Sequence, residues 1–246
     1  MDFTIVSLRT NPDLVGEAER VLAGNWPLFT LHGEGGARLW PRITADFAEH
    51  QVVMVGDDGR AMAVAYSVPF AWDGTDGDLP TGWDDVLQRA VADHDAGRTP
   101  TAASALSVTI DAPHRGKGLS TPMITAVKQA AAERGLAPFI VPVRPTRKSA
   151  YPLTPMERYI RWTNEDGSPF DPWVRVHWRA GASVIRVCPQ SMGITGSVSD
   201  WEDWTGMRFP ETGEYIVPGG LVPVSISTEQ DHGLYLEPNV WMLHKN

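Results

Sequence analysis

Residues 115–120 read Arg-Gly-Lys-Gly-Leu-Ser and stand at the start of a predicted helix. The first backbone N–H groups of a helix have no partner within it, and the helix dipole places partial positive charge at that end. Gly116 and Gly118 lack a Cβ, so an anion can approach the backbone closely, while Arg115 and Lys117 add positive charge. The combination predicts a binding site for a phosphate or diphosphate. The spacing matches neither the P-loop pattern nor the dinucleotide fingerprint G-x-G-x-x-G.

The elements on either side must hold this loop in place. Residues 105–110 predict a short strand, and residues 138–143 predict another. Between them, Met123, Val127 and Ala131 share one face of a helix that extends from residue 119 to residue 134, where Gly135 ends it. Strands and helices alternate first and hairpins occur near both ends, so the class is mixed α/β around one sheet.

This region resembles motif A of the GNAT superfamily of acyl-CoA N-acyltransferases. Residues 108–111 read Val-Thr-Ile-Asp, and Arg115, Gly118 and Ser120 follow in the spacing Arg-x-x-Gly-x-Ser before an apolar helix. The family pattern ends in Gly or Ala, so Ser120 is a departure, although serine is small and can cap a helix. The order of elements matches over residues 1 to 190, and the motif itself over about 105 to 145. The resemblance implies a central mixed sheet that is splayed at the coenzyme A site and flanked by helices.

The resemblance also implies which residues would bind the acyl donor. Backbone groups of Val108, Thr109 and Ile110 would pair with the pantetheine arm as an added strand would. Backbone N–H groups from Gly116 through Lys117, Gly118 and Leu119 to Ser120 would hold the diphosphate beside Arg115. The cosubstrate would be acetyl-CoA or another acyl-CoA, whose thioester carbonyl would lie near strand N–H groups that act as an oxyanion hole. The acceptor would be an amine of a small molecule.

A proton donor for the leaving thiolate is the next requirement of acyl transfer. In the family, a Tyr four residues before a Gly at the end of the later helix often supplies that proton. Here His177 occupies the Tyr position before Gly181, and an imidazole with a pKa of about 6.5 is a competent acid. Tyr151 and Tyr159 are competing candidates. No general base stands out among three carboxylates, which are Glu34, Asp73 and Asp111.

Two alternatives stay open. Some GNAT-like enzymes decarboxylate malonyl-CoA with a His and a Thr, and His177 with Thr146 would fill those roles. The chain would also serve as a coenzyme A-binding module without turnover, since the usual Tyr is missing.

The remaining elements fit one domain over residues 1–246. We predict strands at 3–8, 51–55, 60–68, 182–187, 221–227 and 239–244, and helices at 12–23, 40–48, 83–93 and from Pro172 to about 181. Asp58-Gly59 is a hairpin turn signal, and Gly35 and Gly36 favour a loop before the second helix. Residues 72–102 are interpreted as an insertion or lid, and residues 190–246 as a C-terminal extension.

Composition limits the function. The 246 residues hold 21 basic and 30 acidic side chains, a formal charge of −9, which argues against nucleic-acid binding. The single cysteine, Cys188, and the scattered histidines predict no metal site. The sequence has neither a secretory signal nor a membrane span, so we expect a cytoplasmic protein, and a homodimer is an open possibility.

Tryptophans are frequent in the second half of the chain. They stand near three acidic residues, Asp200, Glu202 and Asp203. Either they pack the core, or they form an apolar acceptor pocket with an acidic rim that suits an amine. The five are Trp162, Trp173, Trp178, Trp201 and Trp204.

Overall fold

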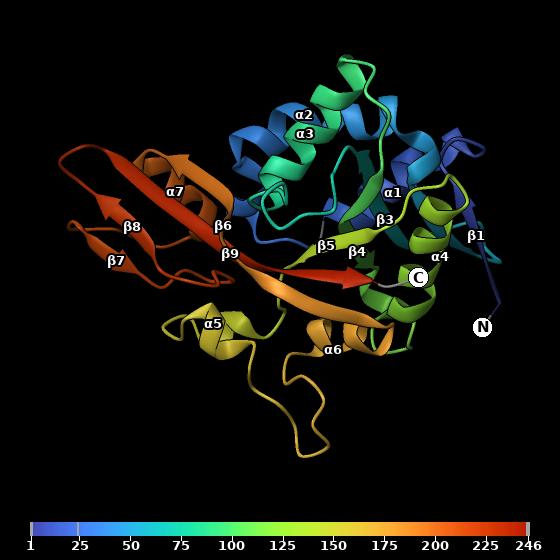
Figure 1. Cartoon of the computed structure of the whole chain (residues 1–246). Helices are drawn as coiled ribbons and strands as arrows, with labels where there is room; N and C mark the ends of the chain where they lie inside the picture. The colour runs from blue at the N-terminus through green and yellow to red at the C-terminus, as the bar shows by residue number, and fades with distance from the viewer. Residues whose placement is uncertain (1, 24, 245–246) are drawn as a thin grey trace.

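The computed structural model describes residues 2–23 and 25–244, which form a mixed sheet between two layers of helices (Figure 1). Within this described part the sheet has nine strands in the order β1-β2-β3-β4-β5-β9-β8-β7, and β6 pairs with β9. All neighbouring pairs are antiparallel except β4 and β5, which are parallel. The strands are β1 (Phe3–Ser7), β2 (Val52–Gly56), β3 (Ala61–Phe70), β4 (Ala102–Ile110), β5 (Phe139–Val143), β6 (Ala182–Gly196), β7 (Gly213–Tyr215), β8 (Val224–Ser227) and β9 (His232–His244).

Helices cover both faces of this sheet, and each layer closes its own core. The residues of β3 are all buried and alternate between the two cores, with Val64 and Tyr66 on one side and Ala63 and Ala65 on the other. The first core includes side chains of α1 (Val15–Ala23), α2 (Glu34–Asp46) and α3 (Trp83–Asp95). The second includes side chains of α4 (Ser120–Ala132), α5 (Met156–Tyr159) and α6 (Pro172–Arg179). Short 3-10 turns occupy Pro12–Leu14, Leu28–His32, Ala48–His50, Ala112–His114 and Lys148–Ala150.

The parallel pair β4 and β5 separates soon after it forms. Ala103 pairs with Phe139 and Ser104 with Ile140, and beyond these two positions the strands diverge toward their carboxyl ends. On its other edge β4 pairs with β3, but the register shifts so that Leu106 is an extra residue between the partners of Tyr66 and Ser67. The sheet is therefore splayed between β4 and β5, as the resemblance implied.

One predicted boundary in the N-terminal half is wrong. Helix α2 begins at Glu34 and not near residue 40, so Gly35 and Gly36 lie inside it. A Cβ on Gly36 would meet the ring of Trp83 at 3.4 Å, and the missing side chain lets α2 and α3 approach closely. The helix within residues 72–102 is α3, and its Val86, Leu87 and Ala90 are fully or almost fully buried in the first core. Helix α3 thus packs against the sheet as part of the first core.

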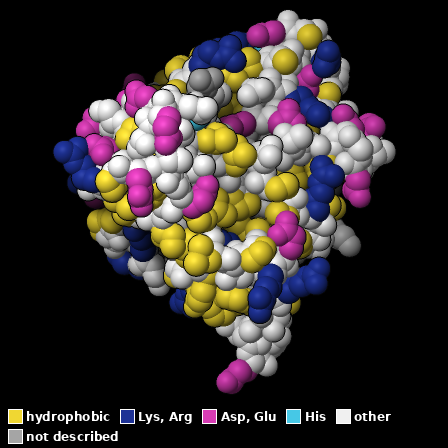
Figure 2. Space-filling model, turned by 90° about the vertical axis from the view of Figure 1, so that its left-hand side faces the viewer, with side chains coloured by type: hydrophobic (Ala, Val, Ile, Leu, Met, Phe, Trp, Pro, Cys, Tyr) yellow, Lys and Arg dark blue, Asp and Glu magenta, His cyan; other side chains and the backbone are white. Residues whose placement is uncertain are grey.

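The C-terminal region is more extended than the sequence indicated. Strands β6 and β9 pair along 11 positions and run past the central sheet toward β7, β8 and α7 (Val198–Thr205), at the left of Figure 1. The predicted strands at 182–187 and 239–244 are only the inner halves of β6 and β9, and neither β7 nor α7 was predicted. Between residues 2 and 244, apart from 24, no helix is both long and apolar enough to cross a membrane. In Figure 2, hydrophobic side chains gather over the middle of one face, while Lys and Arg side chains are scattered around it.

Candidate active site

A cavity of about 390 Å³ occupies the fork between β4 and β5. Its walls come from both strands, from the segment after α1, and from α6 and the C-terminal strands. The lining residues are Asn25, Trp26, Pro27, Trp83, Ala105–Ile110, Arg115, Ser120, Val141–Arg144, Thr146, Trp173, His177, Met192 and Asn239. A cavity of this size, bounded by two diverging parallel strands, can take an extended arm against the free edge of β4.

The residues predicted to bind the acyl donor lie at and around this cavity. Val108, Thr109, Ile110, Arg115 and Ser120 line it directly. The three residues between, Gly116, Lys117 and Gly118, form an exposed turn just outside, whereas the Leu119 side chain is buried in the second core.

The turn has the conformation that the glycines suggested. Gly116 and Gly118 have φ of 75° and 78°, and a Cβ at either position would meet nothing within 4 Å. The N-cap of α4 is Leu119, and no side chain caps the helix, so the expectation that Ser120 caps it is wrong. Because no side chain competes for them, the first N–H groups of α4 are available to an anion.

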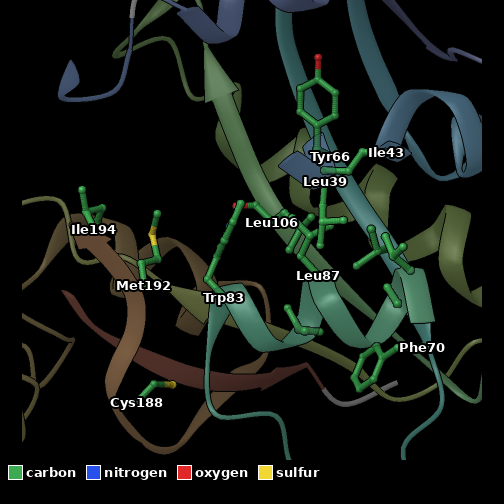
Figure 3. Packing of buried hydrophobic residues seen from close by; sticks show 14 of the residues in the cluster. Leu39, Ile43, Tyr66, Phe70, Trp83, Leu87, Leu106, Cys188, Met192 and Ile194 are labelled. Atoms are coloured by element: carbon green, nitrogen blue, oxygen red, sulfur yellow. The ribbon is translucent and has the colours of Figure 1, made fainter. Parts of the chain in front are cut away.

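The bulge at Leu106 marks the narrow end of the fork. The indole Nε1 of Trp83 donates to the carbonyl of Leu106 at 2.8 Å, a contact that spans from α3 to β4 (Figure 3). Leu106 has no partner in the register of β3, so the regular ladder is interrupted at this residue. Backbone N–H groups at such a bulge can stabilise negative charge on a carbonyl oxygen bound in the cavity.

Trp83 is itself held in place by the C-terminal strands. Its backbone N–H donates to Ser191 Oγ at 2.8 Å, and Ser191 Oγ donates to Asn239 Oδ1 at 2.8 Å. Gly82 makes this approach possible, because a Cβ there would lie 2.2 Å from the Cα of Ser191. The narrow end of the fork is thus assembled from β4, α3, β6 and β9.

His177 also lines the cavity, but its surroundings change its chemistry. It is 1% exposed, and its Nδ1 lies 2.9 Å from Nε2 of His244, which is also buried. Nε2 of His177 has no hydrogen-bond partner among the described residues. Burial, together with His244, lowers the pKa of His177 to about 3. The ring is therefore neutral near pH 7, and the expectation of an acid with an ordinary imidazole pKa is wrong.

Thr146 and His177 are brought to the same cavity by one carboxylate. Asp171 caps α6 by accepting from the backbone N–H groups of Trp173 and Val174, as the sequence indicated. The same carboxylate accepts from the N–H of Thr146 at 3.2 Å and of Arg147 at 2.8 Å. It therefore ties the loop after β5 to the helix that carries His177.

Neither competing tyrosine is placed to donate a proton in the cavity. The hydroxyl of Tyr159 donates to Asp171 Oδ2 at 2.8 Å, and burial and that carboxylate raise its pKa. Tyr151 packs edge-on against Trp162 and does not line the cavity.

Two of the three suggested general bases, Asp111 and Asp73, do not line the main cavity. Asp111 pairs with Arg20 at 2.8 Å, and Asp73 closes a turn with Thr75 next to a different cavity. The side chain of Glu34 lies outside the described part of the structure.

A second cavity of about 320 Å³ adjoins the first. Five residues line both cavities, so the two meet beside the bulge: Trp26, Trp83, Leu106, Ser107 and Met192. The remaining walls come mostly from the segment after α1 and from α2. Three indoles dominate the second cavity, those of Trp26, Trp40 and Trp83, and Trp40 and Trp83 are parallel with centroids 6.1 Å apart.

The tryptophan cluster that the sequence suggested is not an acceptor pocket. Trp201 is fully buried against Phe29 and Tyr235, and Trp162 packs on the tyrosines of the 151–159 segment. Trp178 is half exposed. Of the five, only Trp173 lines the main cavity, where it packs edge-on against His177. The suggested acidic rim is used locally: Asp200 forms the capping box of α7, and Glu202 pairs with Arg208.

Sequence reasoning missed a buried ion pair at the end of β5. Arg144 donates from Nε and Nη2 to the two oxygens of Glu237 at 2.8 and 2.9 Å, and Glu237 is fully buried. A charged residue directly after an apolar strand and before Pro145 is a visible signal. Nothing in the sequence pairs it with a glutamate 93 positions later.

The described part of the chain holds neither a group of metal ligands nor an exposed thiol. Where the structure describes the chain, no three His, Cys, Asp or Glu side chains gather as metal ligands would. Cys188 is buried in the first core, and burial raises the pKa of its thiol to about 12, so it is a packing residue as predicted.

Comparisons with known proteins agree with this geometry. No protein-family model matches the chain. Arginine N-acetyltransferase avaD of Aspergillus versicolor is 30% identical, with 98% of this chain and 93% of the relative aligned.

Two solved structures share the fold over nearly the whole chain. The loading GNATL domain of CurA from Lyngbya majuscula has a TM-score of 0.58 at 15% identity and covers 100% of this chain and 98% of its own. The GphF GNAT-like decarboxylase in complex with isobutyryl-CoA has a TM-score of 0.55 at 14% identity and covers 99% and 98%. At these identities the similarity shows the fold, while the fungal relative shows the family. The chain therefore belongs to the GNAT superfamily, and it is an acyltransferase that moves a short acyl group from acyl-CoA to an amine of a small molecule.

Proposed function

We propose that the chain transfers an acetyl group from acetyl-CoA to an amino group of arginine or of a closely related amino acid. The observation that carries the proposal is the junction of two cavities at the Leu106 bulge: one follows the free edge of β4, and the other is lined by tryptophans. Direct transfer needs both substrates bound at once, and two cavities that meet at one point can hold them with their reacting groups together. The relative that acts on arginine supports the choice of acceptor.

In this proposal the donor lies in the fork. The diphosphate rests on the turn formed by Gly116 and Gly118 beside Arg115, and the pantetheine arm pairs with the backbone of Val108 and Ile110. The thioester carbonyl then points toward the N–H groups around Leu106. Because these groups are fixed by the sheet and by Trp83, they need no reorganisation when charge develops on the oxygen.

The acceptor enters through the second cavity with its amine directed at the bulge. Indole faces attract cations, so Trp40 suits a guanidinium group, and Trp26, which Arg144 already contacts, suits its apolar stem. The uncharged amine attacks the thioester carbon and releases its extra proton to water, the carbon–sulfur bond breaks, and the thiolate takes up a proton.

The proposal assigns polar contacts to the reacting group. Nε2 of neutral His177 is the unpartnered buried nitrogen at the cavity wall, so it can hydrogen-bond to the tetrahedral intermediate. Thr146, which Asp171 holds on the same wall, supplies a hydroxyl. The same two side chains would serve a decarboxylase, and the experiment below separates the two reactions.

The test measures release of free thiol from acetyl-CoA by the purified full-length chain, with and without L-arginine. We expect release only with the amine present, and a product heavier than arginine by one acetyl group in mass spectrometry. Malonyl-CoA alone should yield no carbon dioxide. Carbon dioxide from malonyl-CoA in the absence of any amine would contradict the proposal in favour of the lyase, and binding without turnover of any amine would favour the binding module.

A further inference from the structure

The charged side chains that line the two cavities are all positive. Among the described lining residues there are two cations, Arg115 and Arg144, and no carboxylate. Such a pair is unexpected in a chain with a formal charge of −9. Arg115 follows β4 at the phosphate turn, whereas Arg144 follows β5 on the opposite side of the fork. One cation therefore serves the donor, and the other requires a separate explanation.

Hydrogen bonds and a ring contact hold the Arg144 guanidinium in one orientation. Its Nε and Nη2 form a two-pronged contact with Glu237, and Nη2 also donates to the carbonyl of Gly219 at 2.7 Å. Glu237 in turn accepts from the hydroxyl of Tyr235 at 2.9 Å. The guanidinium also lies over the ring of Trp26, 5.9 Å from its centroid. These contacts fix the plane of the guanidinium group before any substrate binds.

One edge of the guanidinium remains free. The contacts above use the Nε hydrogen and those of Nη2, and Nη1 has no hydrogen-bond partner in the part of the chain that the structure describes. The Arg144 side chain is 16% exposed and lines the fork cavity. Two N–H groups of a fixed cation thus remain to be satisfied by something that enters the cavity. A carboxylate is the ligand that such donors bind best.

Trp26 indicates which substrate brings that carboxylate. It contacts Arg144 and lines both cavities, so Arg144 lies beside the wall that the two cavities share. We infer that Arg144 is a specificity-determining residue that binds the carboxylate of the acceptor, which makes the acceptor an α-amino acid and not a simple amine. This inference rests on the proposed function and adds to it the group that selects the substrate class.

The test compares amino acids with the amines that lack only the carboxylate. Three matched pairs are L-arginine with agmatine, L-lysine with cadaverine, and L-tryptophan with tryptamine, each at saturating acetyl-CoA. For the best pair we expect kcat/KM to be at least about tenfold higher for the amino acid, because the amine cannot form the charge-assisted hydrogen bonds with Arg144. This comparison needs no variant, so it does not depend on whether a mutant folds. An amine that reacts as well as its amino acid would overturn the inference.

Arg144→Lys then assigns the effect to this side chain, since it keeps the positive charge beside Glu237 and loses the free edge. We expect kcat/KM for the amino acid to fall at least about tenfold through KM, while the matched amine changes less than about twofold and the Kd of acetyl-CoA is unchanged. A rise in the Kd of acetyl-CoA with equal losses for both acceptors would instead place Arg144 in the donor site and refute the inference.

If no acceptor in any pair is acetylated, the proposed function is wrong. Calorimetric titration of L-arginine and agmatine into the chain with coenzyme A then tests the inference alone. Binding of arginine but not agmatine would support a carboxylate site at Arg144, and equal or absent binding would refute it.

Discussion

The two walls of the fork differ in how they are built. The donor wall is one continuous stretch, from the bulge at Leu106 to the start of α4 at Ser120, and its residues are neighbours in sequence. The acceptor wall combines Trp26, Trp83, Arg144 and Asn239, which come from four distant segments. In the proposed function the acyl donor is therefore bound by a local motif, whereas the acceptor is bound by residues that long-range contacts bring together.

The walls also differ in burial. The turn around Gly116 and Gly118 is exposed and open, so its cations act through solvent. The acceptor wall rests on buried polar groups that satisfy one another, such as Glu237 with Arg144 and Tyr235. Losing one group should therefore have a small effect on the donor wall and a large effect on the acceptor wall.

The largest effect is expected at Glu237. In Glu237→Gln the buried guanidinium of Arg144 loses its counter-ion, and removing one partner of a buried pair costs about 3–5 kcal/mol. The measurement is the free energy of unfolding from urea denaturation. Glu211→Gln, at an exposed position, is the matched control and should change it by less than about 0.5 kcal/mol. Similar small losses in both variants would mean that the acceptor wall is not stabilised by this pair.

In the proposed function, His177 forms a hydrogen bond to the reacting group. His177→Ala should lower kcat at least about tenfold, because a hydrogen bond to the reacting group is lost, and leave the Kd of acetyl-CoA unchanged. Steady-state kinetics and calorimetry measure the two quantities, and His177→Asn repeats the test with a smaller cavity. Trp178→Ala, at the half-exposed neighbour, is the control. An unchanged kcat in both His177 variants would remove this residue from the mechanism.

Buried histidines should make the chain sensitive to acid. Burial lowers the pKa of His50, His177 and His244 to about 4, 3 and 4, so the unfolded chain binds protons more readily than the folded one. Their contribution to stability is complete above about pH 6.5 and is lost progressively as the pH falls toward 4. Asp84 acts in the opposite direction, because burial raises its pKa to about 6.

The three buried histidines together change the stability more than Asp84 does. We therefore expect Tm to fall by about 5 °C or more from pH 7 to pH 5. Differential scanning calorimetry measures this slope. His177→Asn should make it shallower, whereas His94→Gln, at an exposed imidazole, should not. A Tm that stays constant or rises toward pH 5 would show that these rings are not buried in their neutral form.

The smallest effect is expected on the donor wall. Arg115→Ala removes one exposed charge from the phosphate turn, which should raise the Kd of acetyl-CoA about fivefold at low salt and less at high salt. The KM of the amine should not change. Arg9→Ala, at another exposed arginine, is the control, and equal changes in the two variants would show that Arg115 has no specific role.

Much of the donor half could be predicted from the sequence because its signals are local. Gly116 and Gly118 require positive φ, the apolar spacing of Met123 and Val127 defines a helix face, and Asp171 before Pro172 marks a helix start. The glycines of α2 show where such signals fail. Gly35 and Gly36 are typical of loops, yet packing of α2 against Trp83 overrides that preference.

By itself the sequence determined the superfamily, the sheet with its phosphate turn, and the position of His177, since each depends on residues close together in the chain. Tertiary structure decided that His177 is neutral, because only the fold buries its ring against His244. It also decided which tryptophans line the second cavity and that Arg144 is paired with Glu237. Such contacts join segments up to about a hundred residues apart, and no local spacing encodes a contact of that kind.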